Sequence, residues 1–239
     1  MSNAHHKAID VIAFDADDTL WHNESLFTVT QAKFKQLLAG YHSDEWIEAK
    51  LNETEMRNIE HFGYGIKGFT LSMIETAIEL TEGRISGAEI QEIIGYAKAM
   101  LQAPVDLLDG VRETISQLAG QYQLMLITKG DLFDQESKIA RSGLGDYFNL
   151  VEIVSEKNAG VYRAIIAKHR LDPQRFLMVG NSIKSDILPV IDAGGRAVYV
   201  PYHTTWVHER VTDYDAASFF EIAHMGLLPG LLEELTGEV

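Results

Sequence analysis

Five short apolar runs alternate with amphipathic stretches along this chain, and the alternation limits the possible folds more than any other feature. The runs lie at residues 9–14, 123–127, 150–154, 176–179 and 197–200. Between them, apolar residues recur at helical spacing, as Val111, Ile115 and Leu118 do. Short strands without a polar face belong in a parallel sheet that helices cover on both sides. The sequence therefore predicts an α/β fold.

The segment between the first two runs breaks this alternation. Residues 22–103 show one helical pattern after another and no convincing strand. The clearest apolar face comprises Ile90, Ile93, Ile94, Ala97 and Leu101, and Ile74 with Ile78 marks another. Residues 61–69 read as a glycine- and aromatic-rich loop, and Pro104 ends the last helix. We expect a core domain of residues 1–20 and 105–239 with an all-α domain inserted at 21–104.

Composition restricts the partners and the compartment. The chain has 239 residues, of which 46% are hydrophobic, so it suits one core domain with an insertion. Its net charge of −15 argues against binding to nucleic acid or to an anionic membrane. It has no cysteine, no apolar run long enough to cross a membrane, and no signal-peptide stretch at its start. We therefore expect a cytoplasmic protein.

Three aspartates, Asp15, Asp17 and Asp18, follow the first apolar run within four positions. In open parallel sheets, sites form at the carboxyl ends of the strands. A hard cation such as Mg²⁺, which prefers oxygen ligands, would remove the repulsion among the carboxylates. One carboxylate could attack phosphorus, and a second one two residues later could transfer protons. The alternative is an acidic loop in which Thr19 caps a helix.

Polar side chains also follow the next three apolar runs. Thr128 follows the second run, Lys157 lies beyond the third, and Asn181 and Asp186 follow the fourth. Each has an ordinary alternative: Thr128 as a turn residue, Lys157 as a surface charge and Asn181 as a helix cap. The Thr128 hydroxyl could bind a phosphate oxygen, and because these groups occupy successive strand ends, we interpret them together as a functional site.

The ensemble resembles the haloacid dehalogenase superfamily, in its phosphatase branch. The sequence "DADDT" at 15–19 is similar to the first motif of that family, and "LITKG" at 126–130 to the second. Lys157 corresponds to the third motif and "GNSIKSD" at 180–186 to the fourth. The resemblance implies a Rossmann-like core with an inserted C1-type helical cap that moves as a lid. It also implies Mg²⁺-dependent hydrolysis of a small phosphorylated metabolite through an aspartyl phosphate.

The resemblance also implies residue roles. Asp15 would be the nucleophile and a Mg²⁺ ligand, and Asp17 the general acid and base, with its backbone carbonyl on the metal. Thr128 and Lys157 would hold the phosphoryl group, while Asn181 and Asp186 would complete or orient the metal shell. Two positions depart from the pattern: Asn181 stands where an aspartate is frequent, and Lys129 where an asparagine is common. Lys129 would add a cation near the phosphate.

Candidates for substrate contacts are Trp21, His22 and the loop that carries Tyr64 and Lys67. Trp21 could instead pack at the hinge of the insertion, His22 could serve there as a hydrogen-bonding group, and Lys67 could be solvated. Residues 202–210, "YHTTWVHER", read as structure or as the rim of the site, because His203 and His208 lack the spacing of metal ligands on a helix.

Other functions on the same fold stay open. In a dehalogenase Asp15 would attack carbon, which needs neither a metal nor a second acid; Asp17 argues against this chemistry and Asn181 mildly for it. A phosphomutase would use both aspartates. A non-catalytic binding or regulatory protein would be expected to have lost the nucleophile, which this chain keeps.

Overall fold

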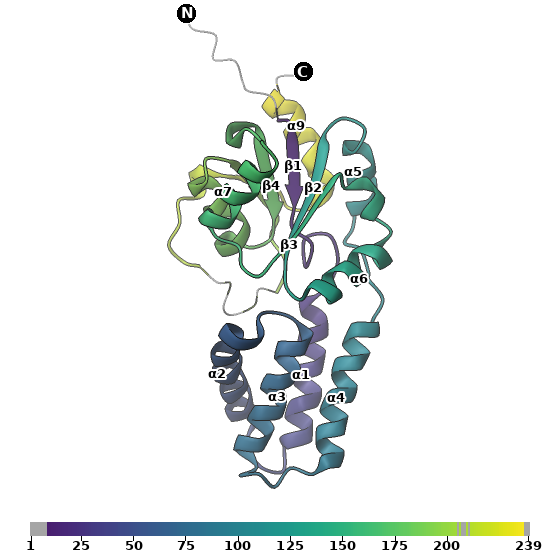
Figure 1. Cartoon of the computed structure of the whole chain (residues 1–239), viewed down its shortest axis with the longest axis vertical. Helices are drawn as coiled ribbons and strands as arrows, with labels where there is room; N and C mark the ends of the chain where they lie inside the picture. Colours follow the sequence, from purple (N-terminus) through teal and green to yellow (C-terminus); the bar gives the residue numbers. More distant parts are fainter. Residues whose placement is uncertain (1–8, 205, 207–208, 210, 237–239) are drawn as a thin grey trace, which may run out of the picture. The chain divides into compact units, whose positions relative to one another are not determined.

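The computed structural model describes residues 9–204, 206, 209 and 211–236 (Figure 1). The chain divides into two compact units. The α/β unit comprises Met1–Glu24, Val105–Lys129 and Lys138–Val239, and the helical unit comprises Ser25–Pro104 with Gly130–Ser137. The grouping of Gly130–Ser137 with the helical unit has no counterpart in the domain boundaries expected from the sequence.

The α/β unit contains a six-stranded parallel sheet, which confirms the predicted fold class. The strand order is β3-β2-β1-β4-β5-β6. The strands are β1 (Val11–Phe14), β2 (Gln123–Lys129), β3 (Leu150–Val154), β4 (Phe176–Gly180), β5 (Arg196–Tyr199) and β6 (Phe220–Glu221). The sequence did not predict β6, because two exposed residues make no apolar run.

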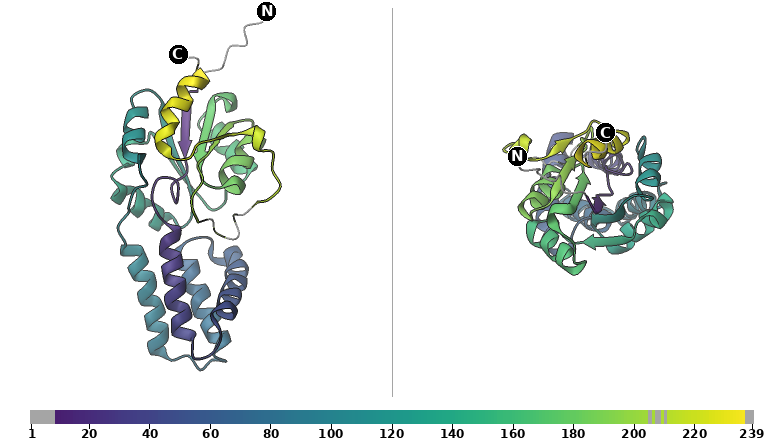
Figure 2. Two further views of the ribbon diagram at one scale, coloured as in Figure 1. Left: turned by 180° about the vertical axis from the view of Figure 1, so that it is seen from behind. Right: turned by 90° about the horizontal axis from the view of Figure 1, so that it is seen from above.

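Alternate residues of the inner strands enter two different hydrophobic clusters, one on each face of the sheet. Ile12 and Phe14 pack with α5 (Val111–Leu118) and α9 (Leu228–Thr236). Val11 and Ala13 pack with α7 (Ala159–Lys168) and α8 (Leu188–Asp192). Seen from behind, α9 lies in front of the sheet, on the side opposite to α7 (Figure 2). Both faces of these strands are thus apolar, as the sequence predicted.

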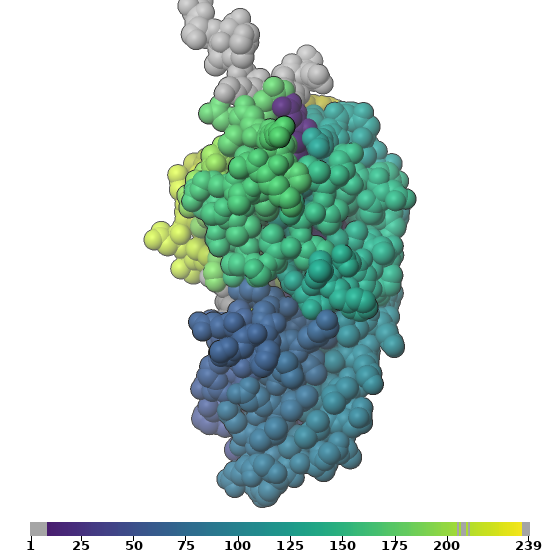
Figure 3. Space-filling view, viewed as in Figure 1, coloured from purple at the N-terminus to yellow at the C-terminus, as the bar shows by residue number. Residues whose placement is uncertain are grey.

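The middle of the sheet is enclosed. Ile12, Ala13 and Phe14 of β1 have no exposed surface. On the face drawn in Figure 3, the purple segment of the α/β unit reaches the surface only near its start. Polar groups at the end of β1 therefore lie next to a buried apolar core, where charges interact strongly.

Four helices make up most of the helical unit: α1 (Glu24–Leu38), α2 (Asp44–Phe62), α3 (Ile66–Leu80) and α4 (Gly87–Gln102). The first residue of α1, Glu24, ends the first segment of the α/β unit. Their apolar sides form one cluster, with Phe34, Ile47, Met73 and Ile93 at its centre. A capping box between Ser86 and Glu89 starts α4. The helix ends before the extended Ala103, as Pro104 requires.

Two details of the helical prediction were wrong. The buried face of α3 follows Phe69, Met73 and Ala77, whereas Ile78 is 44% exposed. The expected loop at 61–69 shrinks to residues 63–65, because α2 continues to Phe62 and α3 begins at Ile66. Gly63 and Gly65 both have positive φ angles, which let the chain turn this sharply.

The remaining helix, α6 (Leu132–Ser142), begins in the helical unit and ends in the α/β unit. A π-helical turn, Ile183–Ile187, precedes α8 and carries Asp186. Short 3₁₀ turns occur at Gly145–Tyr147, Pro173–Arg175, Ala216–Ser218 and Met225–Leu227. Within the described part of the chain, no helix has both the length and the apolar character needed to span a membrane.

Candidate active site

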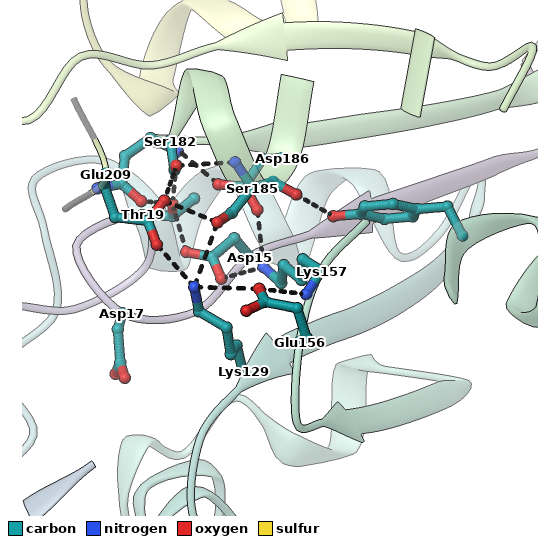
Figure 4. Close-up of polar contacts among 12 residues, drawn as sticks. Asp15, Asp17, Thr19, Lys129, Glu156, Lys157, Ser182, Ser185, Asp186 and Glu209 are labelled. Atoms are coloured by element: carbon teal, nitrogen blue, oxygen red, sulfur yellow. Dashed lines mark hydrogen bonds and ion pairs between the residues drawn. The ribbon is translucent and has the colours of Figure 1, made fainter. Parts of the chain in front are cut away.

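The strand order places a switch point at β1, since its neighbours β2 and β4 belong to connections that run in opposite directions along the sheet. Asp15 follows β1, Asn181 follows β4, and Lys157 lies three residues after β3. Figure 4 shows that the side chains of Asp15 and Lys157 converge at the carboxyl edge of the sheet, and Thr19 Oγ1 contacts both Asp15 and Asn181. Thr128 is the penultimate residue of β2 and is 1% exposed.

Lys157 joins two carboxylates in the interior. Its Nζ lies 2.5 Å from Asp15 Oδ1 and 2.7 Å from Asp186 Oδ1, and its side chain is 2% exposed. Burial by itself would lower the pKa of Lys157, but the charges of Asp15 and Asp186 outweigh burial and hold this pKa above its ordinary value. Lys157 therefore carries its charge at neutral pH and compensates the charge of Asp15.

Asp186 is held from both ends of its carboxylate. One oxygen accepts from Lys157 and the other from the backbone N–H of Ser182 at 3.0 Å. Burial raises the pKa of Asp186 to about 7, although Lys157 acts in the opposite direction. Because both oxygens are engaged, Asp186 is placed to orient Lys157.

Gly180 leaves room for the Asp186 carboxylate. A Cβ atom at position 180 would lie less than 3.0 Å from three side-chain atoms of Asp186. Asp186 is too firmly held to move aside without cost, so the glycine is a packing requirement of the site.

We expect Gly180→Ala to displace Asp186, and with it Lys157. The free energy of unfolding should fall by about 1–3 kcal/mol, and turnover should fall with it. Gly95→Ala is the matched control. Gly95 lies within α4, and a Cβ atom there would have no neighbour within 4 Å. Urea unfolding of the three proteins tests this: equal stabilities of the Gly180→Ala and unchanged proteins would contradict the packing requirement.

Two side chains, Thr19 and Asn181, contact the second oxygen of Asp15. Thr19 Oγ1 donates to Asp15 Oδ2 at 3.0 Å. With its amide turned to satisfy its neighbours, Asn181 donates to Asp15 Oδ2 at 3.3 Å and to the backbone carbonyl of Asp17 at 3.2 Å. One atom of the Asn181 amide thus lies between a carboxylate oxygen and a carbonyl oxygen.

This donor set fits a hard cation. It combines a carboxylate, a backbone carbonyl and an amide, all oxygen ligands once the Asn181 amide turns its oxygen inward. Among the described residues, no cluster of three or more histidine, cysteine, aspartate and glutamate side chains could hold a metal. A metal here would therefore depend on the carbonyl and amide oxygens as well as on Asp15.

The carboxylate of Asp17 faces elsewhere. Its two oxygens each lie 2.7 Å from Lys138 Nζ, and Trp21 Nε1 donates to Oδ1 at 2.7 Å. In Figure 4 the carboxylate points away from that of Asp15. Lys138 comes from α6 and is 7% exposed. Sequence reasoning missed it, because one lysine on an amphipathic helix resembles a surface charge.

Asp18 is compensated by backbone groups. Its φ angle is 61°, and its carboxylate accepts from the N–H groups of Asn23 at 2.9 Å and Glu24 at 3.1 Å. Burial is the largest effect on this carboxylate and raises the pKa of Asp18 to about 7. The three aspartates of the first motif therefore have three different partners: Lys157, Lys138 and the turn at 23–24.

The raised pKa values in this turn predict a pH-dependent stability. Burial also raises the pKa of Glu24 to about 7. Asp18 and Glu24 bind protons more tightly in the folded protein than in the unfolded chain, whose values are 3.8 and 4.5. Their contribution is therefore complete below pH 4 and is lost as the pH rises to 7.

We expect the metal-free protein to lose about 1–3 kcal/mol from these two groups between pH 5 and pH 8. Asp18→Asn keeps an acceptor for Asn23 and Glu24 without the titration, so it should flatten the profile and raise stability at pH 8. Urea titrations of both proteins across this range check the sign. A profile that Asp18→Asn leaves equally steep would contradict the assignment to Asp18.

Lys129 lies in a second polar network. Its Nζ donates to Glu209 Oε1 at 2.6 Å and to Ser185 Oγ at 3.3 Å. Glu209 also accepts from the hydroxyls of Ser182 and Ser185. Lys129 is therefore near the predicted phosphate site but has a carboxylate as its counter-ion. No motif pointed to Glu209, which lies in the polar run 202–210. His208 of that run is outside the described residues.

The substrate candidates occupy different surroundings. Trp21 is 1% exposed and packs in the core of the α/β unit, so the substrate contact proposed for it is replaced by packing and by its bond to Asp17. His22 is exposed, and its Nδ1 lies 2.7 Å from the Tyr202 hydroxyl. Lys67 donates to both oxygens of Asp131, at 2.9 and 3.0 Å, within the helical unit.

Comparisons with known proteins match most of this chain. A family model described as haloacid dehalogenase-like hydrolase matches residues 9–194. A haloacid dehalogenase-like family hydrolase from Xanthomonas campestris has a TM-score of 0.86 and 42% identity, over 97% of this chain and 93% of that one.

Curated relatives are more distant. The pyrimidine 5'-nucleotidase YjjG of Escherichia coli is 26% identical over 209 residues, which are 81% of this chain and 87% of the relative. The N-acylneuraminate-9-phosphatase of Mus musculus is 24% identical over 212 residues, 84% of this chain and 83% of the relative. The family model and the Xanthomonas structure together confirm the resemblance seen in the motifs: this chain belongs to the haloacid dehalogenase-like hydrolases.

Proposed function

We propose that this protein is a Mg²⁺-dependent phosphatase that hydrolyses a small phosphorylated metabolite, with Asp15 as its nucleophile. The environment of Asp15 is the main support for the proposal. One oxygen contacts the buried ammonium group of Lys157, and the other contacts the side chains of Thr19 and Asn181. A carboxylate so placed has a fixed direction of attack. The names of the curated relatives, one a nucleotidase and one a phosphatase, support a phosphate monoester as substrate.

The reaction has two steps. In the first, an oxygen of Asp15 forms a bond to phosphorus, the bond from phosphorus to the leaving oxygen breaks, and Asp17 gives that oxygen a proton. In the second, water attacks phosphorus of the aspartyl phosphate, loses a proton to Asp17 and frees Asp15. Lys157 and Thr128 would hold the phosphoryl oxygens, and Lys129 would add a positive charge if it leaves Glu209 for the substrate.

Asp15, the carbonyl of Asp17 and the amide of Asn181 would hold Mg²⁺, and Asp186 would position Lys157 beside them. When bound, the ion neutralises charge on the phosphate and on Asp15. The helical unit would serve as the cap that supplies most substrate contacts, with Lys67 as a candidate, and His22 would add a contact from the α/β unit.

Replacing Asn181 by aspartate should tighten Mg²⁺ binding by about tenfold or more, because a charged oxygen ligand replaces a neutral one. Calorimetric titration with MgCl₂ measures this directly. Asn149→Asp is a control, because Asn149 accepts from Leu124 N at a different part of the sheet. Weaker Mg²⁺ binding by Asn181→Asp than by the unchanged protein would remove Asn181 from the ligand set.

Turnover of a panel of phosphate monoesters, with and without exhaustive chelation, tests the proposed function. We expect phosphate release that stops on chelation and returns with Mg²⁺. Undiminished halide release from a 2-haloacid after chelation would support the dehalogenase reading instead. Absence of phosphate release from the whole panel, with Mg²⁺ shown to be bound, would refute the phosphatase.

The variant Asp17→Asn distinguishes the proposed acid–base role of Asp17 from the nucleophilic role of Asp15. Loss of proton transfer should lower turnover of an alkyl phosphate by about 10²–10⁴-fold. Formation of the phosphoenzyme from nitrophenyl phosphate should fall much less, because nitrophenolate leaves without a proton. Equal losses with both substrates would make Asp17 a structural or purely electrostatic residue.

A further inference from the structure

Lys138 is a buried lysine whose place in the reaction no motif describes. Its side chain is 9% exposed, and its Nζ contacts both oxygens of Asp17 at 2.7 Å and Asn23 Oδ1 at 3.3 Å. Asp17 lies in the loop after β1, whereas Lys138 lies in the second half of α6. The contact thus joins parts of the chain that are 121 positions apart.

Stability alone does not account for this pair. Removing a lysine and a carboxylate from water costs about as much as their attraction returns, so an apolar pair of similar size would serve the fold equally well. The buried face of α6 is also unusually polar, since it carries four buried polar side chains: Asp134, Gln135, Lys138 and Ser142. Burying polar groups costs solvation free energy, so the fold alone does not favour them, and we look for their role in the site.

The geometry fixes one property of Asp17. An ammonium group that contacts both oxygens, together with Trp21 on Oδ1, determines the rotation of the carboxylate about its Cα–Cβ bond. Proton transfer requires the acid to lie within hydrogen-bond reach of the leaving oxygen. The residue that determines where the Asp17 carboxylate stands therefore determines how well it reaches that oxygen.

We propose that Lys138 is a positioning residue for Asp17: it holds the carboxylate in the arrangement from which proton transfer occurs, and acts on the reaction only through Asp17. This inference rests on the acid–base role proposed for Asp17. Lys138 differs in this from Lys157, which contacts Asp15 itself.

The test combines two substrates with a double-mutant cycle. Single-turnover formation of the phosphoenzyme is measured with an alkyl phosphate and with nitrophenyl phosphate for Lys138→Gln, Asp17→Asn and the double variant. We expect Lys138→Gln to slow the alkyl phosphate by about 10–100-fold, within the range of acid–base catalysis, and nitrophenyl phosphate by less than about threefold. In the Asp17→Asn background, Lys138→Gln should cause no further loss.

Two further variants exclude general disruption. Lys138→Arg, which keeps a charged donor able to contact both oxygens, should recover most of the alkyl phosphate rate. Lys168→Met removes a lysine that is paired with Glu152 and 61% exposed, and should change neither rate. Equal losses with both substrates, or a loss that persists in the Asp17→Asn background, would overturn the proposal.

A crystal structure of the Lys138→Gln protein tests the geometric part independently of activity. The Asp17 carboxylate is expected to leave the orientation that it has beside Lys138. If it keeps that orientation without the lysine, Lys138 does not position it, whatever the protein hydrolyses. Failure of the phosphatase proposal would appear differently, as absence of turnover in the unchanged protein.

Discussion

Asp15→Asn is expected to abolish phosphate release, by about 10⁴-fold or more, because the attacking oxygen loses its charge and its nucleophilicity. Asp17 cannot take over the attack, because Lys138 and Trp21 hold its carboxylate in a different direction. The fold should survive, since Lys157 keeps Asp186 as a partner.

Steady-state phosphate release with the best substrate of the panel measures this loss. Asp10→Asn is the matched control: Asp10 precedes β1, pairs with Arg175 and is 51% exposed. It should retain full activity. Turnover by Asp15→Asn within tenfold of the control would exclude Asp15 as the nucleophile.

Lys157→Met is expected to damage both activity and stability. It leaves the buried carboxylates of Asp15 and Asp186 without their shared cation, which typically costs about 3–5 kcal/mol when one partner of a buried pair is removed. Activity should fall by about 10³-fold or more, since a charge that would stabilise the transferring phosphoryl group is lost as well.

The stability loss should grow with pH. With Lys157 present the pKa of Asp186 is about 7 and Lys157 lowers it, so in Lys157→Met this pKa would be higher. At pH 6 Asp186 would then be protonated and only one charge would be uncompensated, whereas raising the pH would increasingly charge both carboxylates. Urea unfolding of Lys157→Met at pH 6 and pH 9 should therefore show the larger loss at pH 9, with Lys168→Met as the control. A loss of the same size at both pH values would contradict the shared-cation account.

The predictable part of the site follows from strand ends. Because all strands run in one direction, Asp15, Lys157 and Asn181 had to reach one edge of the sheet once the apolar runs were identified as parallel strands. The core was predictable for the same reason, since strands buried on both faces must be apolar throughout.

Contacts supplied by helices and long loops were not predictable. Lys138 reaches Asp17 from the middle of a helix, and Glu209 reaches Lys129 from a polar loop. The sequence around each of these residues is like that around a solvent-exposed charge. Only the tertiary structure shows that the two side chains are buried in the site or contact it. The different contacts of Asn181 and Asp186 were likewise hidden, because motif spacing does not show that Lys157 and Ser182 engage both Asp186 oxygens.

Trp21 shows the opposite error. An aromatic residue just after the acidic motif suggested a substrate contact, yet its ring is buried and its nitrogen binds Asp17. Tryptophan has a large apolar surface and one hydrogen-bond donor. A core position beside a carboxylate buries the ring and gives the donor a partner. The closeness of Trp21 to the nucleophile in the sequence did not distinguish this packing role from a substrate contact.

The central claim is that Asp15 carries the phosphoryl group between the two steps. Mass spectrometry of acid-quenched protein tests it most directly, with Asp17→Asn used to slow the second step and nitrophenyl phosphate as the donor. We predict one added phosphoryl group on the peptide that contains Asp15, and none when Asp15→Asn is combined with Asp17→Asn. Phosphate release by the unchanged protein, with no phosphoryl group on that peptide at any quench time, would contradict the claim.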